Sequence, residues 1–553
     1  MVFAYPHTPH IPPRRGGLKE ARTLLSTPEH ETPSEIGRFL ALWAIRRRTD
    51  KVLDPAMGSG ALLRCAFDRL RQLGVRSPGP QLFGVEIDTD RRDAATRRFE
   101  AAGRFRPTLI LNDFLGLAKR DNPFPGNFEA IICNPPFLRR QEIPASYRIV
   151  LDRIAFPKKA DGNGGSGLAG LHLHFILKAL EFARPGGRLA FVLPSTMFSA
   201  AYSARLKSLL RNQTTISGLL IFDPELLVFP GVLTSTALLL ITKRRPIPEH
   251  KAVVAELHQV GQAEELLRVL GSREGDGFGD VFRSRQSRWS PRRNWGGLSA
   301  FRLRPTKGAR QLDDFVAVRR GIATGANSYF TLSGEAARAL DLPAGSLKRI
   351  ASTAGLHFYD FCEGDLSRLE SCGEKTYLFS VTPTYGEQAA VRKYIELGEA
   401  TGIPHRYLTS HRRNWFVVER VPHAPVLFTY MTRKRPRFVL NKTGAVHLNN
   451  LLGVYPRSGV STQSLPALLA LLNCTEFVKR LPAVGRTYAG GLLKVEPGDL
   501  VRSTIPDITQ LDVSTRTELG DAFQRLCYLA RIGRAVDGLS ELDGTVSDVT
   551  ERF

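Results

Sequence analysis

Short apolar runs alternate with amphipathic stretches between residues 34 and 245. The runs with the composition of buried strands are KVLDPA, QLFGVEID, PTLILND, FEAIICNPPF, GRLAFVLPS, ISGLLIF and STALLLITK. Stretches between them, such as ALLRCAFDRLRQLG and LHLHFILKALEFARPGG, carry apolar residues three and four positions apart and end at glycine, as amphipathic helices do. This alternation predicts an α/β domain with a doubly wound, mostly parallel, Rossmann-like sheet, which we assign to residues 1–245.

The pattern changes after residue 245. Residues 246–310 contain the Arg-rich, Pro-interrupted run RSRQSRWSPRRNW, which predicts a polar, basic connector. Residues 311–505 combine short apolar runs with glycines and clustered cations, which predicts a second domain of the α+β class. Residues 506–553 predict an amphipathic helix followed by an acidic tail of low order. Within the first domain, residues 138–170 are basic and then glycine-rich, which predicts a mobile loop beside the functional site.

The chain of 553 residues carries 77 Lys and Arg against 53 Asp and Glu, a formal net charge of +24. This excess indicates a polyanionic partner, and nucleic acid is the leading candidate. The six cysteines are scattered without the spacing of a zinc site, so we expect reduced thiols and no metal. Prolines interrupt the N-terminal region, and no run reaches the roughly 18 apolar residues of a spanning helix. We therefore expect a cytoplasmic, nucleoid-associated protein without membrane contact.

Polar side chains stand where three of the predicted strands end, and such positions form the ligand-binding edge of an open parallel sheet. The turn Asp54–Gly60 brings glycines and free N–H groups to this edge, and Glu86 offers a carboxylate for the hydroxyls of a ribose. One strand later, Asp113 offers an acceptor for an exocyclic amine beside the aromatic ring of Phe114. Each feature alone could be a tight turn or a helix cap, but three in succession predict an adenosine pocket.

The tetrapeptide Asn134-Pro135-Pro136-Phe137 directly follows the apolar run Ala130–Cys133. Two prolines hold the backbone rigid after a strand and remove competing N–H donors. The Asn134 side chain and the Pro135 carbonyl can then both accept hydrogen bonds from one amine. An ordinary proline-rich loop is the alternative interpretation.

These motifs resemble those of the gamma-class N6-adenine DNA methyltransferases of the TaqI type. Glu31-Thr32-Pro33 and Leu226-Leu227-Val228-Phe229-Pro230 extend the resemblance. It implies a methyltransferase domain that uses S-adenosylmethionine, followed by a target-recognition domain. The implied catalytic residues are Asn134, Pro135 and Phe137, and the implied cofactor-binding residues are Thr32, Asp54, Ala56, Gly58, Gly60, Glu86, Ile87, Asp113 and Phe114.

The resemblance also implies which part of each ligand these residues contact. Asp54 would lie nearest the methionine portion of the cofactor, Glu86 at its ribose, and Asp113 with Phe114 at its adenine. Phe137 would stack face-on against a flipped-out base, and Phe229 would lie edge-on against it.

Three later segments are similar to recognition-domain segments of larger members of this group. They are Arg319–Asn327, Arg433–Arg437 and Arg486–Gly491. Each could be a solvated surface, but the net charge favours contact with DNA, for which we single out Arg319, Lys434 and Arg435.

The function implied is a site-specific DNA adenine N6-methyltransferase, which moves a methyl group from S-adenosylmethionine to a flipped-out adenine in double-stranded DNA. It would serve restriction-modification or phage defence, with a separate restriction endonuclease or defence-complex subunits as possible partners, because the sequence shows no nuclease cluster and only about thirty residues precede the methyltransferase part. The alternatives are an RNA or protein amine methyltransferase and a non-catalytic DNA-binding specificity subunit. Cytosine N4 is disfavoured because its signature usually begins with Ser.

Overall fold

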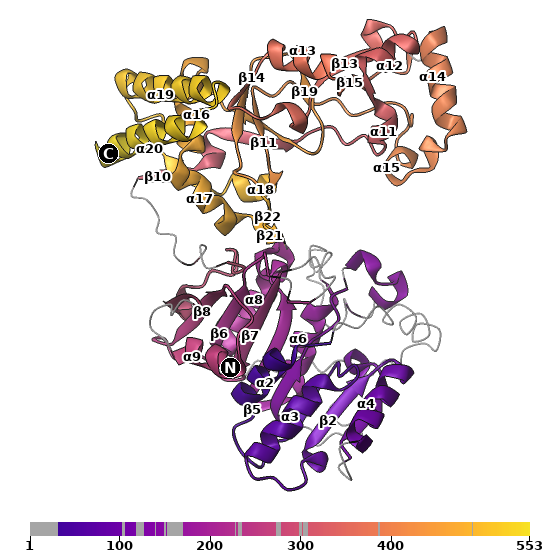
Figure 1. The fold of residues 1–553 in the computed structure, drawn as a ribbon, viewed down its shortest axis with the longest axis vertical. Coiled ribbons are helices and arrows are strands. Elements are labelled where there is room, and N and C mark those ends of the chain that lie inside the picture. The colour runs from indigo at the N-terminus through magenta and orange to yellow at the C-terminus, as the bar shows by residue number, and fades with distance from the viewer. Residues whose placement is uncertain are drawn as a thin grey trace, which may run out of the picture. The chain divides into compact units, whose positions relative to one another are not determined.

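The computed structural model describes residues 31–101, 106–117, 127–138, 140–148, 151, 170–226, 228–229, 235–271, 278–297, 301, 308–384, 388–488 and 490–552. The chain forms two compact units (Figure 1). The first comprises Met1–Arg302 together with Arg486–Gly491, and the second comprises Leu303–Gly485 and Leu492–Phe553. Residues 152–169, the larger part of the expected mobile loop, lie outside the described residues.

The first unit is built on a nine-stranded sheet in the order β3-β2-β1-β4-β5-β7-β6-β8-β9. The strands are β1 Val52–Asp54, β2 Leu82–Glu86, β3 Thr108–Leu111, β4 Phe128–Cys133, β5 Ala183–Pro194, β6 Thr215–Phe222, β7 Thr236–Thr242, β8 Lys251–Leu257 and β9 Gly279–Arg285. Strands β7 and β9 run antiparallel to their neighbours, and the others are parallel. The predicted doubly wound, mostly parallel sheet is therefore confirmed. Its strand order reverses between β1 and β4.

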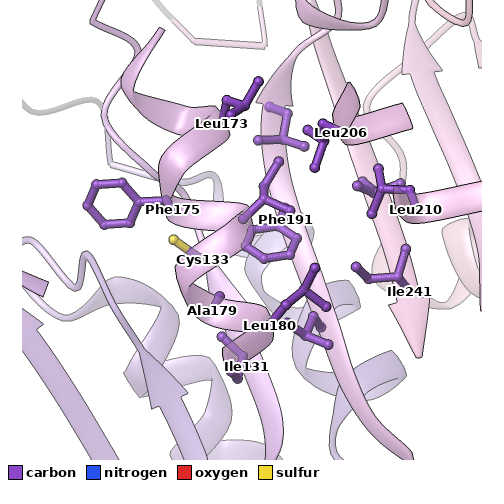
Figure 2. Close-up of a cluster of buried hydrophobic side chains, with 14 of the residues drawn as sticks. Ile131, Cys133, Leu173, Phe175, Ala179, Leu180, Phe191, Leu206, Leu210 and Ile241 are labelled. Atoms are coloured by element: carbon purple, nitrogen blue, oxygen red, sulfur yellow. The ribbon is translucent and has the colours of Figure 1, made fainter. Parts of the chain in front are cut away.

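Helices cover both faces of this sheet, because successive residues of a buried strand point to opposite sides. Ile131 and Cys133 of β4 belong to one core cluster, whereas Ala130 and Ile132 belong to another. The first cluster is closed by α6 Leu171–Phe182 and α8 Ala204–Gln213, and the second by α2 Ser34–Ala44, α3 Ala61–Gln72, α4 Thr89–Ala101 and α9 Ala263–Gly271. Figure 2 shows the first core, where side chains of α6 and α8 lie against β4, β5 and β7.

The basic connector expected at residues 246–310 is wrong for most of its length. Strand β8 pairs in parallel with β6, and β9 pairs with β8, so both extend the sheet of the first unit. Trp289 and Trp295, from the Arg-rich run, are buried in the first core with ring centroids 5.1 Å apart. The first domain thus continues to Arg302.

The second unit contains a five-stranded sheet in the order β11-β20-β16-β18-β14 and a four-stranded sheet in the order β12-β15-β13-β19. Its strands are β10 Ala309–Gln311, β11 Val316–Arg320, β12 Thr331–Ser333, β13 Leu347–Ala351, β14 Asp360–Phe361, β15 Lys375–Phe379, β16 Val426–Phe428, β17 Met431–Thr432, β18 Phe438–Asn441, β19 Val446–His447, β20 Leu452–Pro456, β22 Leu492–Lys494 and β23 Thr504–Pro506. Its helices are α11 Asn327–Phe330, α12 Gly334–Ala339, α13 Glu363–Ser371, α14 Ala389–Ala400, α15 Tyr407–Ser410, α16 Leu465–Asn473, α17 Thr475–Val484, α18 Pro497–Leu500, α19 Val513–Arg531 and α20 Ala535–Arg552. This mixture agrees with the α+β expectation.

The expected C-terminal tail is instead the helix α20, which packs on α19. Leu542, Val546 and Val549 of α20 share a core with Leu526 of α19. Arg531 of α19 pairs with Asp360 and with Asp365 on α13, each through its guanidinium group. Most of the acidic residues that suggested a tail of low order therefore lie on the exposed side of an amphipathic helix, α20. No helix in the described ranges is both long and apolar enough to cross a membrane.

Candidate active site

The ends of β1, β2, β3 and β4 lie side by side, because these strands are parallel neighbours. The turn Asp54–Gly60, Glu86, Asp113 and the tetrapeptide Asn134–Phe137 therefore share one edge of the sheet. This edge includes the point between β1 and β4 where the strand order reverses, which is where open α/β sheets bind ligands.

Asp54 stabilises the turn after β1, because its Oδ1 accepts a hydrogen bond from the Ala56 N–H at 3.2 Å. Asp54 is 0% exposed, and its expected position at the methionine portion of the cofactor stays a prediction. Gly60 has a φ of +85°, and a Cβ there would lie 3.2 Å from the Cβ of Ala95 on α4. Glycine at this position lets α3 begin in close contact with α4.

Glu86 is oriented by three backbone groups. Its Oε1 accepts hydrogen bonds from the N–H groups of Ile87 and Asp88, and its Oε2 accepts one from Gly58, all at 2.9 Å. Burial raises the pKa of Glu86 above its ordinary value, and these hydrogen bonds oppose that rise. Since a carboxylate has about four acceptor positions, the side chain keeps capacity for a ligand hydroxyl in a fixed direction. Ile87 is partly exposed beside it.

Asp113 is fixed by two hydrogen bonds. Its Oδ1 accepts from the backbone N–H of Leu115 at 3.0 Å, and its Oδ2 accepts from the Tyr147 hydroxyl at 2.7 Å. Burial raises the pKa of Asp113, and the hydrogen bond from Tyr147 opposes that rise. Sequence reasoning missed Tyr147, since nothing in the sequence pairs a tyrosine with a carboxylate 34 positions away.

Phe114 does not present a free ring face, in contrast to the stacking role expected for it. The residue is 2% exposed, and its ring stacks on Phe175 of α6 with centroids 5.6 Å apart. It also lies 5.3 Å from the ring of Phe182. Phe114 is therefore a core residue, next to Asp113 in the sequence.

Asn134 contacts the segment that precedes α2. Its Nδ2 donates a hydrogen bond to the Thr32 hydroxyl at 3.1 Å. The neighbouring Glu31 accepts a hydrogen bond from the Ser59 hydroxyl at 3.4 Å. Residues 31 and 32 thus connect the glycine turn with the tetrapeptide. Because Nδ2 of Asn134 contacts Thr32, the Oδ1 of Asn134 points away from Thr32.

Phe137 lies between two aromatic rings and is partly exposed. Its centroid is 6.4 Å from that of His172 and 6.5 Å from that of Phe229, and both pairs meet at an interplanar angle of 83°. Phe229 is 3% exposed and packs in the second core. The structure therefore brings together the two aromatic residues expected at a flipped base, although little of the Phe229 ring is open to a ligand.

His172 is a site residue that sequence reasoning missed. It is 6% exposed, in the first turn of α6, and neither ring nitrogen has a hydrogen-bond partner among the described residues. Burial lowers the pKa of His172 to about 3, so the ring is neutral near pH 7.

The cations singled out in the second unit divide into exposed and structural groups. Arg319 and Lys434 are exposed. Arg435 instead donates a hydrogen bond to the backbone carbonyl of Asn473 at 2.6 Å, and its Nε is buried. Since Arg435 is committed to the fold, its expected role as a phosphate contact is not supported.

A more exposed cationic surface surrounds α15, which the sequence analysis did not single out. Arg406 and Arg413 are exposed there, and Tyr407 is 79% exposed. No acidic residue occurs between Ala400 and Val418. The intervening Arg412 is structural, because its guanidinium group donates to the carbonyl of Ala323 at 2.5 Å.

The segment Arg486–Gly491, expected in the recognition domain, belongs to the compact first unit. The backbone N–H of Gly490 donates to the carbonyl of Pro224 at 2.8 Å. Its short strand β21, Arg486–Tyr488, thus lies with the loop that carries Phe229. Ala489 is outside the described residues.

Comparison with known proteins indicates the family to which this fold belongs. The family profile described as "N-6 DNA Methylase" matches residues 26–294, and the one described as "Type II methyltransferase M.Eco57I, C-terminal domain" matches residues 300–540. Over residues 26–294, the chain matches the family of N-6 DNA methylases. It is a DNA adenine methyltransferase of the kind found in restriction-modification systems. The predicted family is confirmed at this level, and its TaqI-type motif assignment stays a prediction.

The relatives of this methylase match over most of their length. Type II methyltransferase M.XamI of Xanthomonas campestris pv. amaranthicola is 28% identical over 87% of this chain and 85% of its own. Type II methyltransferase M.AccI of Acinetobacter calcoaceticus is 24% identical over 90% of this chain and 88% of its own. The type IIL restriction-modification enzyme MmeI, solved in complex with DNA, shares the fold with a TM-score of 0.61 at 13% identity, over 96% of this chain and 73% of its own.

Among the described residues of this methylase, no group of three or more His, Cys, Asp or Glu side chains is arranged to hold a metal ion.

Proposed function

We propose that this methylase transfers the methyl group of S-adenosylmethionine to the N6 amine of an adenine that has left the DNA duplex. The observation that carries the proposal is the position of Asn134, which is hydrogen-bonded to Thr32 and lies on the sheet edge shared with Glu86 and Asp113. Asn134 Oδ1 and the Pro135 carbonyl would accept the two N–H bonds of the amine.

These two acceptors address the chemical difficulty of the reaction. The lone pair of an adenine amine is delocalised into the ring, which makes the nitrogen a poor nucleophile. Hydrogen bonds to both N–H groups concentrate electron density on the nitrogen and favour a pyramidal geometry. Phe137 is partly exposed and would stack on the base, which offsets part of the few kcal/mol lost when the base leaves the helix. Catalysis then rests on positioning and electrostatics.

The residues present fit the adenosine part of S-adenosylmethionine, which supplies an electrophilic methyl group when bound. Glu86 and Asp113 are carboxylates at neighbouring strand ends, each 7% exposed and oriented by hydrogen bonds within the protein. Glu86 would hold the ribose hydroxyls, and Asp113 would accept the adenine amine. Thr32, Ala56, Gly58, Gly60 and Ile87 would line the same site.

Replacing Asp113 by alanine should weaken binding of S-adenosylhomocysteine, the reaction product, by about 1–3 kcal/mol, because the adenine amine loses a buried acceptor. Tyr147→Phe should have a smaller effect, because it removes one of two hydrogen bonds that orient the carboxylate. Isothermal titration calorimetry would measure both. Asp68→Ala is the control, since Asp68 is an exposed residue of α3 paired with Arg64. Equal affinity in Asp113→Ala and the wild type would place the adenine elsewhere.

We propose that the second unit selects the DNA sequence and that exposed cations hold the phosphates. Arg319, Lys434, Arg406 and Arg413 are the exposed candidates, and Tyr407 stands exposed between the last two. Cations bind the polyanionic backbone of any sequence, whereas side chains reaching base edges determine specificity.

Single alanine replacements of Lys434, Arg406 and Arg413 should weaken binding to all duplex sequences alike. Each lost phosphate contact should reduce the slope of log affinity against log salt by about one. Arg435→Ala should instead lower the free energy of unfolding by about 1–3 kcal/mol, because it removes a charged donor from the Asn473 carbonyl. Arg525→Ala, at an exposed ion pair with Glu541, is the control. Salt titrations that show unchanged slopes in all three exposed variants would place the phosphate contacts on other residues.

The test of the proposed function is to express the chain in a host without adenine methylation and to map modified bases by sequencing. N6-methyladenine at one recurring sequence is expected. Modified RNA or protein with unmodified DNA would favour the other amine methyltransferases. Binding of DNA with no methylation and no cofactor affinity would favour a specificity subunit. The restriction-modification setting also makes a separate endonuclease, or subunits of a defence complex, candidates for co-purification.

A further inference from the structure

The chain returns from the second unit to the first for only six residues. Residues up to Gly485 belong to the second unit, Arg486–Gly491 belongs to the first, and the chain is back in the second unit from Leu492 onward. A detour of this kind orders backbone at two crossings, which costs conformational entropy. This cost suggests that the six-residue segment contributes something that the rest of the first unit lacks.

The returning segment contacts both ends of the connection between β6 and β7, which carries Phe229. At the near end, the Gly490 N–H donates to the Pro224 carbonyl at 2.8 Å. At the far end, the Ser235 hydroxyl donates to the Thr487 carbonyl at 3.4 Å. Ser235 also hydrogen-bonds Ser195, which directly follows β5. Strand β21 therefore lies along the part of the site assigned to the target base rather than along the cofactor turn.

Arg486 is the charged residue of this segment. Its guanidinium group makes no hydrogen bond or ion pair with any residue in the described ranges, and its Nε is buried. Two other arginines of the first unit do have acidic partners: Arg64 pairs with Asp68, and Arg38 pairs with Glu35 and Glu264. Tyr202 interacts electrostatically with Arg486 but is a neutral group, because burial raises the pKa of Tyr202 to about 12 against the opposing effect of Arg486. A partly exposed cation without a counter-ion, beside a site for a polyanion, matches a phosphate group.

We propose that Arg486 binds a backbone phosphate of the DNA strand that carries the target adenine. The inference rests on the proposed function, because it takes the loop with Phe229 as the target-base side of the site. It assigns β21 to the handling of the target nucleotide, whereas the sequence analysis placed this segment in the domain that selects the DNA sequence. The phosphate next to a flipped-out base must move with the backbone, so a fixed guanidinium there stabilises the extruded state and contacts every substrate equally.

The experiment compares Arg486→Ala, Arg486→Lys and the control Arg64→Ala, all in the full-length protein. Duplex DNA containing the mapped methylation site, with 2-aminopurine at the target position, reports base extrusion by fluorescence. The alanine variant should bind this duplex about tenfold more weakly, with a salt slope lower by about one phosphate contact and a reduced 2-aminopurine signal at saturation. Lysine should restore the salt slope but only part of the fluorescence, because it provides a point charge without the planar fork. Arg64→Ala should match the wild type in every measurement.

Two further measurements separate the inference from structural effects and from the proposed function. Affinity for S-adenosylhomocysteine and the sequence methylated should be unchanged in Arg486→Ala. An unchanged salt slope with lost activity would mean that Arg486 only supports the fold, and a changed target sequence would mean that it reads a base; either result overturns the inference. Absence of adenine methylation by the wild-type protein would overturn the proposed function instead.

Discussion

Asn134→Ala is expected to lower the rate of methyl transfer by roughly 10²–10³-fold or more, because preorganised polar groups at the reacting atoms contribute about that much. The variant loses one of the two acceptors for the adenine amine, and the remaining Pro135 carbonyl cannot hold the nitrogen in a pyramidal geometry by itself. Affinity for S-adenosylhomocysteine should stay nearly unchanged, because Glu86 and Asp113 keep their hydrogen-bond partners within the protein. Single-turnover methylation and calorimetry would measure the two effects.

Phe137→Ala and Asn212→Ala complete this comparison. Phe137→Ala should retain part of the rate at saturating DNA but bind the flipped base more weakly, because only stacking is removed. Asn212 is exposed on α8, where its Nδ2 contacts Ser208, so its replacement should leave methylation unchanged. A normal rate in Asn134→Ala would show that the amine is held by other groups.

Exchange of the recognition segment is the second change with a large expected effect. The sequence analysis would exchange residues 311–505, but the structure indicates 311–485 together with 492–505 as the better choice, because Arg486–Gly491 belongs to the first unit. A chimera carrying the corresponding segment of a relative with another specificity should methylate the relative's sequence and no longer its own. Base-edge contacts of a few side chains, each worth about 1–3 kcal/mol, determine such a choice. Sequencing of modified bases would identify the new site.

Exchange of residues 486–491 alone is the matched control, and it should leave the methylated sequence as it was. An active chimera of residues 311–485 and 492–505 that still methylates the original sequence would place recognition in the first unit. The two chimeras together therefore separate sequence choice from the handling of the target base.

The sheet edge was predictable because its signal is local. A buried strand followed at once by Glu86, Asp113 or Asn134 can be read along the chain, and parallel topology then brings these ends together. Which of two neighbouring side chains turns into the core was less predictable. Asp113 keeps a little exposure, whereas the Phe114 ring turns into the core against Phe175, and nothing in the dipeptide distinguishes these outcomes.

The connector was misread for a related reason. The run Lys251–Leu257 has apolar residues at its centre but lies near the Arg-rich stretch that dominated the interpretation of residues 246–310. Its strand character depends on β6, which lies more than 25 residues earlier in the chain and offers the parallel partner. The polar composition of such a segment reflects the side chains on its exposed face. Its position in the fold depends on which strand it pairs with.

By itself, the sequence determined the α/β class and the order of the motifs along the chain, and it predicted the amine and adenosine contacts, because each depends on residues close together in the chain. Only the tertiary structure decided which cations are available for DNA. Arg435 is committed to the carbonyl of Asn473, 38 residues later, while Arg406 and Arg413 stay exposed. It also decided that Tyr147 orients Asp113 and that β21 lies with the catalytic unit. Hydrogen bonds and charge pairs join partners far apart in sequence, so only their positions in the folded chain reveal them.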